Sequence, residues 1–459
     1  MGNLTAGLNI ALQSMLAEQG AIDTTSNNIA NVNTPGYARQ RVDLEETPPI
    51  QIGNITYGTG AQLKQVLSLR DSILDLRVNQ ETQQQGKLDS FLSSAQQIQA
   101  LFNETSGTGL QSDLTAFFNS FSELSTNPSD LNLRQAVLTA GQNLASAFQQ
   151  SSNSLANLQH SVDLSVTQSV NQINTLAQQI AVVNTQVAAA VSSGQNAGAF
   201  IDQRQQLINQ LSSLVDVSEI DAGGGSLTLT TSNGAALVVG GQSFAWTTQA
   251  DPTTALQHIY SQGSDITARI SGGQLAGQLQ VRDQEIPSLQ GSLDALAGDL
   301  STAVNTQHQA GFDLSGAAGG NFFTAAPAGN VGAAASIQVA ITDPSRIAAS
   351  SDGSAGDNGN SNAILALQNQ NFINGLTPIG AYAGLVFKIG NDVQSAQSNE
   401  AAGSQVLQQL QNLQGGVSGV DINEESANLI RFQNAYSASA RVASVIDSLL
   451  QTTIDMVNP

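Results

Sequence analysis

The sequence predicts a mainly α-helical protein with a smaller β part. Its expected architecture is a pair of N- and C-terminal coiled-coil helices, a helical-bundle second domain and a small β-rich outer segment. Three observations support this: apolar residues seven apart at both ends, apolar stripes at helical spacing between them, and a glycine-rich stretch of strand-like residues near the middle. With 459 residues, 40% of them apolar, the chain can form two or three packed domains.

The N-terminal end carries the first coiled-coil register. Its seam positions are Leu8, Met15, Ile22 and Ile29. The neighbouring seam position holds Glu18 and Thr25, and two glycines each lower helix propensity by roughly 1 kcal/mol relative to alanine. We therefore expect a helix that is poorly stable alone and that ends near Pro35, because proline cannot continue the hydrogen-bond ladder.

The C-terminal end carries a stronger register. Its seam positions are Ile422, Leu429, Phe432, Tyr436, Ile446 and Leu450. Asp421 followed by Glu424 resembles an acidic capping box and predicts a helix that runs to Val457. Glycines at 415, 416 and 419 are expected to break the chain just before it. Pairing the two terminal helices is the simplest way to cover both apolar stripes.

Between the ends, helical stripes run through residues 88–102, 166–187 and 286–304. Residues 218–270 instead combine glycines, alternating Leu and Thr, and an Asn233-Gly234 turn signal, which predicts short antiparallel strands. The predicted domains are a terminal helical core of residues 1–40 and 415–459, a mainly helical middle domain of residues 41–217 and 271–414, and a β-rich segment of residues 218–270.

Composition excludes several classes of function. A net charge of −21 without clustered Lys or Arg argues against nucleic-acid binding. The absence of cysteine excludes disulfides, thiolate metal sites and cysteine nucleophiles. The histidines His160, His258 and His308 are far apart and lack a partner at metal-ligand spacing. We therefore expect no catalytic residues, metal or cofactor, and no enzyme such as a wall hydrolase or protease.

The N-terminal segment lacks the basic and apolar regions of a cleaved secretory signal, and no stretch approaches transmembrane length. We therefore expect no membrane insertion. The pattern allows either a cytosolic protein or export by a route that uses no cleaved signal peptide, and composition does not choose between them.

Two runs resemble the terminal signatures of the flagellar rod, hook and hook-associated proteins. The N-terminal run, residues 26–37, carries the signature positions Asn28, Asn31, Asn33, Pro35, Gly36 and Tyr37. The C-terminal run, residues 423–436, carries Asn428, Arg431 and Gln433. The tripeptide Arg431-Phe432-Gln433 and central segments such as Gly311-Phe312-Asp313-Leu314 favour the hook-associated protein 1 family.

This resemblance implies a structural subunit that forms the junction between the flagellar hook and filament, by self-assembly of its terminal helices. It implies export through the type III apparatus, an extracellular position in the flagellum and a role in motility. The implied partners are copies of the chain in a ring, the hook protein, hook-associated protein 3 and a flagellar export chaperone. The alternative is a hook or distal rod axial protein. A secreted adhesin would need a larger recognition domain than the β-rich segment.

Overall fold

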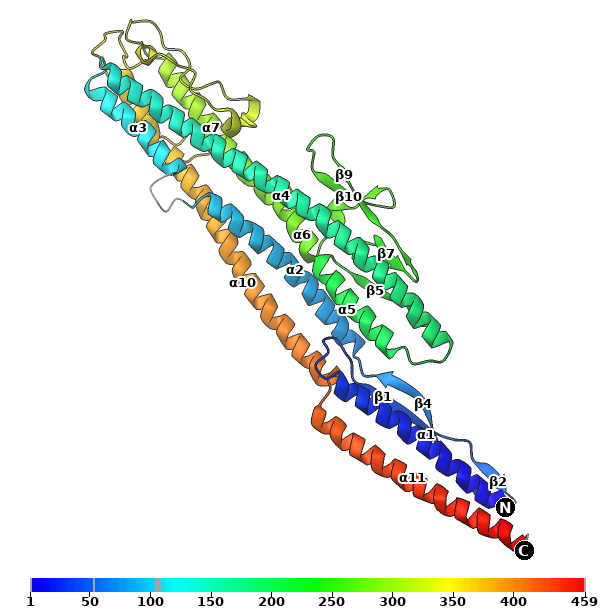
Figure 1. Ribbon diagram of the computed structural model, residues 1–459. Coiled ribbons are helices and arrows are strands. Elements are labelled where there is room, and N and C mark those ends of the chain that lie inside the picture. Colours follow the sequence, from blue (N-terminus) through cyan, green and yellow to red (C-terminus); the bar gives the residue numbers. More distant parts are fainter. Residues whose placement is uncertain (1, 53, 104–108, 458–459) are drawn as a thin grey trace.

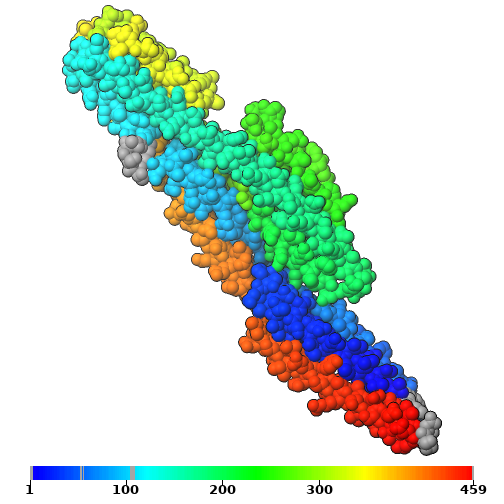
Figure 2. Space-filling model, in the orientation of Figure 1, coloured from blue at the N-terminus to red at the C-terminus, as the bar shows by residue number. Residues whose placement is uncertain are grey.

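The computed structural model describes residues 2–52, 54–103 and 109–457. The molecule is elongated, with long helices that run along a common direction (Figure 1). Both termini lie at its narrow end, and the molecule widens where the β-rich segment lies against the helices (Figure 2). The mainly α fold with small sheets is as predicted. Among the described residues, no helix is both long and apolar enough to cross a bilayer.

The narrow end consists of α1 (Gly2–Ala30) and α11 (Ile422–Val457), which lie antiparallel along each other. Their contact is the most extensive between any two elements. A Cβ atom added to Gly7 would lie 3.1 Å from Cδ1 of Ile446, so the backbones approach closely there. The predicted pairing of the chain termini is therefore present within one subunit.

Residues 40–68 form two antiparallel hairpins, which the sequence analysis did not predict within the mainly helical middle domain. The strands are β1 (Gln40–Glu46), β2 (Ile50–Ile52), β3 (Ile55–Tyr57) and β4 (Ala61–Ser68). β1 pairs with β4, and β2 pairs with β3. The larger hairpin packs on α1, where a Cβ added to Gly20 would lie 3.3 Å from Leu63. These residues belong structurally with the terminal helices.

The middle of the molecule is a bundle whose long helices contain all three predicted stripes. They are α2 (Ser72–Leu101), α3 (Leu110–Thr126), α4 (Leu131–Ser192), α5 (Gly198–Leu214), α6 (Gly273–Gln280), α7 (Ile286–Gln309) and α10 (Pro378–Ser418). Side chains of Asp71, Asp130 and Thr377 accept backbone N–H groups at the starts of α2, α4 and α10. α10 continues through Gly415 and Gly416, and the chain leaves the helix only at Gly419.

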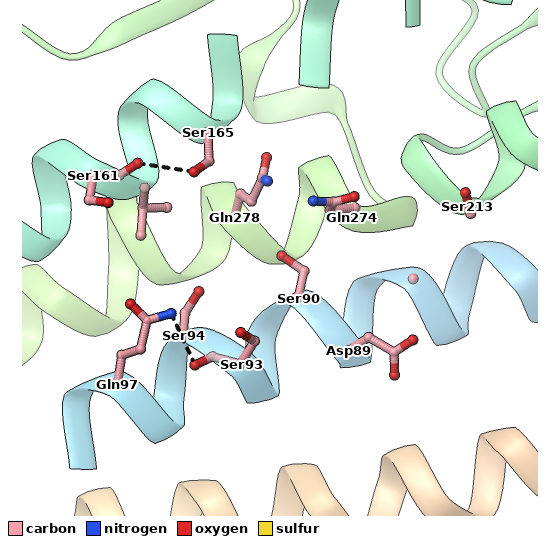
Figure 3. Close-up of a pocket in the computed structure, with 12 residues that line it drawn as sticks. Asp89, Ser90, Ser93, Ser94, Gln97, Ser161, Ser165, Ser213, Gln274 and Gln278 are labelled. Atoms are coloured by element: carbon pink, nitrogen blue, oxygen red, sulfur yellow. Dashed lines mark hydrogen bonds between the residues drawn. The ribbon is translucent and has the colours of Figure 1, made fainter. Parts of the chain in front are cut away.

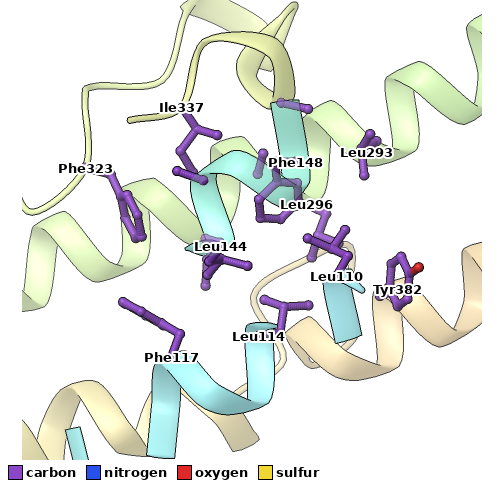
Figure 4. Close-up of a cluster of buried hydrophobic side chains, with 14 of the residues drawn as sticks. Leu110, Leu114, Phe117, Leu144, Phe148, Leu293, Leu296, Phe323, Ile337 and Tyr382 are labelled. Atoms are coloured by element: carbon purple, nitrogen blue, oxygen red, sulfur yellow. The ribbon is translucent and has the colours of Figure 1, made fainter. Parts of the chain in front are cut away.

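The end of the bundle farthest from the termini holds its aromatic core (Figure 4). Five phenylalanine rings stack there, with centroids 4.8–5.9 Å apart: Phe117, Phe118, Phe121, Phe322 and Phe323. The irregular chain around it includes α8 (Ala333–Ser336) and α9 (Gly359–Ala366), with single turns η3 (Ala328–Asn330), η4 (Pro344–Arg346) and η5 (Leu367–Asn369). This core stabilises the bundle independently of the terminal helices.

The predicted strands of residues 218–270 form two small antiparallel sheets. They are β5 (Ser218–Gly223), β6 (Ser226–Thr230), β7 (Ala236–Val239), β8 (Gln242–Ser243), β9 (Trp246–Ala250), β10 (Gln257–Ser261) and β11 (Ser264–Asp265), followed by the turn η1 (Thr267–Arg269). The sheet orders are β5-β6-β7-β8 and β11-β10-β9. Asn174 of α4 donates to the backbone carbonyl of Trp246. Asn184 of α4 donates to the backbone carbonyls of Leu227 and Gly240. The sheets are therefore attached along one side of α4.

Candidate assembly interface

The predicted seam positions lie on α1 and α11, and nearly all of them are partly buried. Nine of the predicted positions are half-buried: Leu8, Met15, Ile22, Ile29, Leu429, Phe432, Tyr436, Ile446 and Leu450. On α11 these residues share the helical face of Ile446, which contacts α1 at Gly7. Ile422 differs, because half of its surface is exposed at the first residue of the helix. The predicted seam residues other than Ile422 are thus partly buried along the α1–α11 pair, and their role as an assembly seam stays a prediction.

The fully buried positions of α1 are small or polar rather than large and apolar. They are Ala11, Ala17, Ala21, Thr24, Thr25 and Asn28. α1 lies between α11 and the β1–β4 hairpin, so it has a second contact face that the seven-residue spacing did not reveal. Gly60 closely approaches Ile10 on that face. Ile10, Ala17 and Thr24 are also seven residues apart, and this second series could have indicated the contact face from the sequence.

Glu18 is a polar position within this seam. Its side chain is half-buried, and its Oε2 atom is buried without a hydrogen-bond partner among the described residues. Burial raises the pKa of the Glu18 carboxyl, while the charge of Arg431 acts in the opposite direction. The buried, unpaired oxygen of Glu18 therefore lowers the stability of the N-terminal helix.

Both helices of the terminal pair expose apolar side chains. On α11 the residues are Ile430, Val442, Val445, Leu449, Ile454 and Met456, and on α1 they are Leu12 and Leu16. Val442, Val445, Leu449 and Met456 follow helical spacing and form one stripe. Met456 is 75% exposed and Val445 is 60% exposed. A continuous apolar stripe on so thin a helix pair is typical of a protein-binding surface.

The N-terminal signature folds around the amide of Asn28, which is buried. Its Nδ2 donates to the carbonyl of Gln40 (2.8 Å) and to Oε2 of Glu425 (3.0 Å). Its Oδ1 accepts from the hydroxyl of Tyr37 (2.8 Å) and from the backbone N–H of Gln40 (2.9 Å). All four hydrogen-bonding positions of the amide are occupied. Asn28 therefore joins α1, the following loop and the start of α11.

Arg39 binds the two glutamates at the start of α11, next to the Asn28 amide. Its Nε donates to Oε1 of Glu425 (2.7 Å), and its terminal nitrogens donate to both oxygens of Glu424 (2.6 and 3.1 Å). Asp421 caps α11 as predicted, by accepting the N–H groups of Asn423 (2.7 Å) and Glu424 (3.3 Å). The expected second half of the capping box is wrong, because the Glu424 carboxylate binds Arg39 instead.

The signature loop also binds the middle bundle. Oδ2 of Asp202 on α5 accepts the N–H of Ala38 (3.2 Å), and Oδ1 of Asp202 accepts from Arg70 (2.7 Å). Arg70 also donates to the carbonyl of Gly36 (3.1 Å). Gly36 has a φ of +76°, a conformation that favours glycine. Sequence reasoning did not find Asp202 or Arg70 as partners of this loop.

The other signature residues lie away from this cluster. Asn31 bonds locally to Asn27 and Thr34, and Asn33 is exposed. The exposed carbonyl of Pro35 accepts from Gln206. On α11, Asn428 is half-buried, Gln433 is exposed, and Arg431 lies over the Phe432 ring, 4.9 Å from its centroid.

Tyr37 is held in its neutral form at this cluster. Burial, together with the nearby charges of Asp202 and Glu425, raises the pKa of the Tyr37 phenol to about 12. The phenol therefore remains a hydrogen-bond donor to Asn28 at neutral pH.

The remaining polar sites are structural in character. His308 is buried between the carbonyl of Gly320 (Nδ1, 2.7 Å) and the N–H of Ala348 (Nε2, 2.8 Å), and His258 pairs with Asp265 (2.7 Å). A cavity of about 440 Å³ between α2, α4 and α6 is lined mostly by Ser and Gln side chains (Figure 3). No group of three or more His, Asp or Glu able to hold a metal lies within the part of the chain that the structure describes.

Comparison with known families places the chain among flagellar axial proteins. The sequence model described as the flagellar hook-associated protein FlgK helical domain matches residues 95–323. The flagella basal body rod protein model matches residues 8–37, and the C-terminal model of the flagellar basal body rod FlgEFG proteins matches residues 414–456. The rod-protein matches are thus confined to the two ends of the chain.

Whole-chain relatives are more specific. Flagellar hook-associated protein 1 of Bacillus subtilis is 32% identical, over 98% of this chain and 97% of its own length. The Escherichia coli protein of the same name is 27% identical, over 98% and 99%. The flagellar hook junction protein FlgK from Burkholderia pseudomallei shares the fold, with a TM-score of 0.68 and 20% identity over 74% of this chain and all of that chain. The chain belongs to the flagellar hook-associated protein 1 family.

Proposed function

We propose that copies of this chain assemble through α1 and α11 to join the flagellar hook to the filament. Family membership makes the chain a structural component of the bacterial flagellum at the hook–filament junction. The single observation that supports assembly through the ends is the exposed apolar stripe on α11, which the subunit itself leaves uncovered. A neighbouring copy of the same helix pair would cover it.

The terminal helices need such a neighbour because they have almost no core of their own. In the described parts of α1 and α11, the only apolar side chains that are fully buried are those of Ala11, Ala17 and Ala21. Burying a Leu- or Ile-sized side chain is worth about 1.5–3 kcal/mol, so covering a few stripe residues outweighs the poor helix propensity of Gly7 and Gly20. Ordering of the ends is therefore coupled to assembly.

The domain division follows from the same reasoning. Starting from the division predicted from the sequence, we propose a terminal domain of residues 1–68 and 415–459, a middle domain of residues 69–217 and 271–414, and an outer segment of residues 218–270. The packing of the β1–β4 hairpin on α1 supports moving residues 41–68 to the terminal domain.

The proposed partners are other copies in a ring, the hook protein, hook-associated protein 3 and an export chaperone. We propose that the chain is exported through the flagellum and acts outside the cell. The role is purely structural and not enzymatic. Its relatives carry structural names, which supports this assignment.

The test is complementation of a strain that lacks the gene. A variant with Ile22, Ile29, Leu429 and Leu450 changed to Asp places charges in the seam and is expected to give cells that end at the hook and release unassembled filament protein. The matched control is Val182→Asp, which changes an exposed apolar residue of α4. Normal filaments from an exported seam variant would refute the proposal.

A further inference from the structure

Arg39 lies where the chain passes from the middle bundle to the terminal pair. α10 ends at Ser418 and α11 begins at Ile422, so only residues 419–421 connect them. Gly419 is exposed, and its extended backbone conformation interrupts the helix between α10 and α11. The direction of α11 relative to α10 therefore depends on the contacts around this short connection.

Arg39 contacts both sides of the break. Its backbone N–H donates to the carbonyl of Ser418 (2.8 Å), the last residue of α10. Its guanidinium binds Glu424 and Glu425 in the first turn of α11 (2.6 and 2.7 Å). One residue from the N-terminal half of the chain thus holds the end of one C-terminal helix and the start of the next.

The contact also depends on α1. Glu425 is only 2% exposed, and it binds Asn28 through one oxygen and Arg39 through the other. The backbone N–H next to Arg39, that of Gln40, donates to Asn28 as well. The Arg39 contact with α11 is therefore complete only when the last turn of α1 is folded.

We propose that Arg39 is a positioning residue that fixes the direction in which the α1–α11 pair leaves the middle bundle. The inference rests on the proposed function and adds to it, because the apolar seam determines whether the terminal helices pair and Arg39 determines where the pair points. A ring of copies requires that direction to be the same in every subunit.

The test uses introduced cysteines, since the chain contains none of its own. Val420→Cys places a thiol at a half-buried position of the α10–α11 connection, and Ala443→Cys places one at a half-buried position of the seam. Each is introduced into full-length protein, and labelling by a maleimide reagent is timed by gel shift on isolated flagella. Arg39→Ala is compared with Arg41→Ala, which removes an exposed arginine two residues away.

The expected result separates direction from folding. Arg39→Ala should raise the labelling rate at Val420→Cys by about tenfold or more, because it leaves the buried Glu425 carboxylate without its charged partner. The rate at Ala443→Cys should stay unchanged, and Arg41→Ala should change neither. Adding Glu425→Gln to Arg39→Ala should give no further increase, since both remove the same contact.

Three outcomes would overturn the inference: an unchanged rate at Val420→Cys in Arg39→Ala, equal increases at both thiols, or additive effects of the two substitutions. Should Arg39→Ala fail to assemble, Arg39→Lys takes its place, because it keeps the charge but loses the planar fork, and it should give an intermediate rate. Failure of the proposed function would look different: Ala443→Cys would label as fast in wild-type flagella as in free subunits.

Discussion

Arg282 provides a sharp test of how the β-rich segment is attached to the bundle. It lies in the wide helical turn η2 (Val281–Glu285) between α6 and α7, and its side chain is 1% exposed. The guanidinium donates to Oδ1 of Asp163 on α4 (2.7 Å), to the carbonyl of Gln257 on β10 (2.7 Å) and to Asp283 (2.7 and 3.0 Å). Asp163 in turn accepts the N–H of Gln257 (2.9 Å). One buried ion pair therefore holds both backbone groups of Gln257.

The perturbation is Arg282→Met, which keeps much of the side-chain length but removes the charge. Asp163 is only 3% exposed, so its carboxylate would remain buried without its charged partner. Breaking a buried pair in this way costs about 3–5 kcal/mol, whereas replacing both partners by apolar residues costs much less. The double variant Arg282→Met with Asp163→Leu should therefore be more stable than Arg282→Met alone. Arg77→Met, at an exposed arginine of α2, should change stability by less than about 0.5 kcal/mol.

The assay is urea unfolding of the full chain, followed by circular dichroism, with hydrogen exchange as the local measurement. In Arg282→Met, the amides of β9 and β10 should exchange faster than those of the aromatic core. The reasoning is wrong if Arg282→Met loses less than about 1 kcal/mol, or if the double variant is less stable than the single one. It also fails if exchange accelerates evenly over the whole bundle.

Two further predictions concern the end of the bundle farthest from the termini. Burial lowers the pKa of His308 to about 4. As the pH falls from about 6.5 to about 4, the His308 imidazole is therefore protonated in the unfolded chain before it is protonated in the folded chain. The free energy of unfolding has its full value above pH 6.5 and should fall by about 3 kcal/mol over this range. His308→Gln should remove this part of the pH dependence from the urea midpoint, and an unchanged slope would contradict the assignment. Gly141→Ala would place a Cβ 2.8 Å from the Phe322 ring and should lower the free energy of unfolding by about 1–3 kcal/mol; an equal urea midpoint would show that the core adapts without strain.

The terminal helices could be predicted from sequence because a seven-residue spacing is a local pattern. Leu429, Tyr436 and Leu450 lie on one face whatever the rest of the chain does. The β1–β4 hairpin was missed although Val42 and Leu44 alternate with polar residues, because Pro48 and Pro49 lie between its strands and weaken the strand pattern. The hairpin covers a second face of α1, and that face is made of alanine and threonine, which carry little hydrophobic signal.

The polar cluster around Asn28 could not be predicted in detail, because its partners are far apart in sequence. Asn28 and Glu425 are 397 positions apart. The resemblance to flagellar proteins marked Asn28 and Tyr37, yet not Arg39 or Arg70. Glu424 had a sufficient local explanation as a capping residue, and only the fold shows that Arg39 competes for its carboxylate. Local sequence patterns predict helices, whereas ion pairs between distant segments depend on the tertiary structure.

The distribution of large apolar side chains explains why the two parts of the molecule behave differently. The middle bundle completely buries the five phenylalanines of its aromatic core, so it can be stable as a free subunit. Among the described apolar side chains of the terminal pair, only those of alanines are fully buried, and Val445, Leu449 and Met456 are exposed, so under the proposed function other copies supply its missing core. Because the same two helices carry the Asn28 and Arg39 contacts, covering the stripe also favours formation of the polar cluster. Under the proposed function, assembly, ordering of the ends and the direction of the terminal pair are thus parts of one coupled equilibrium.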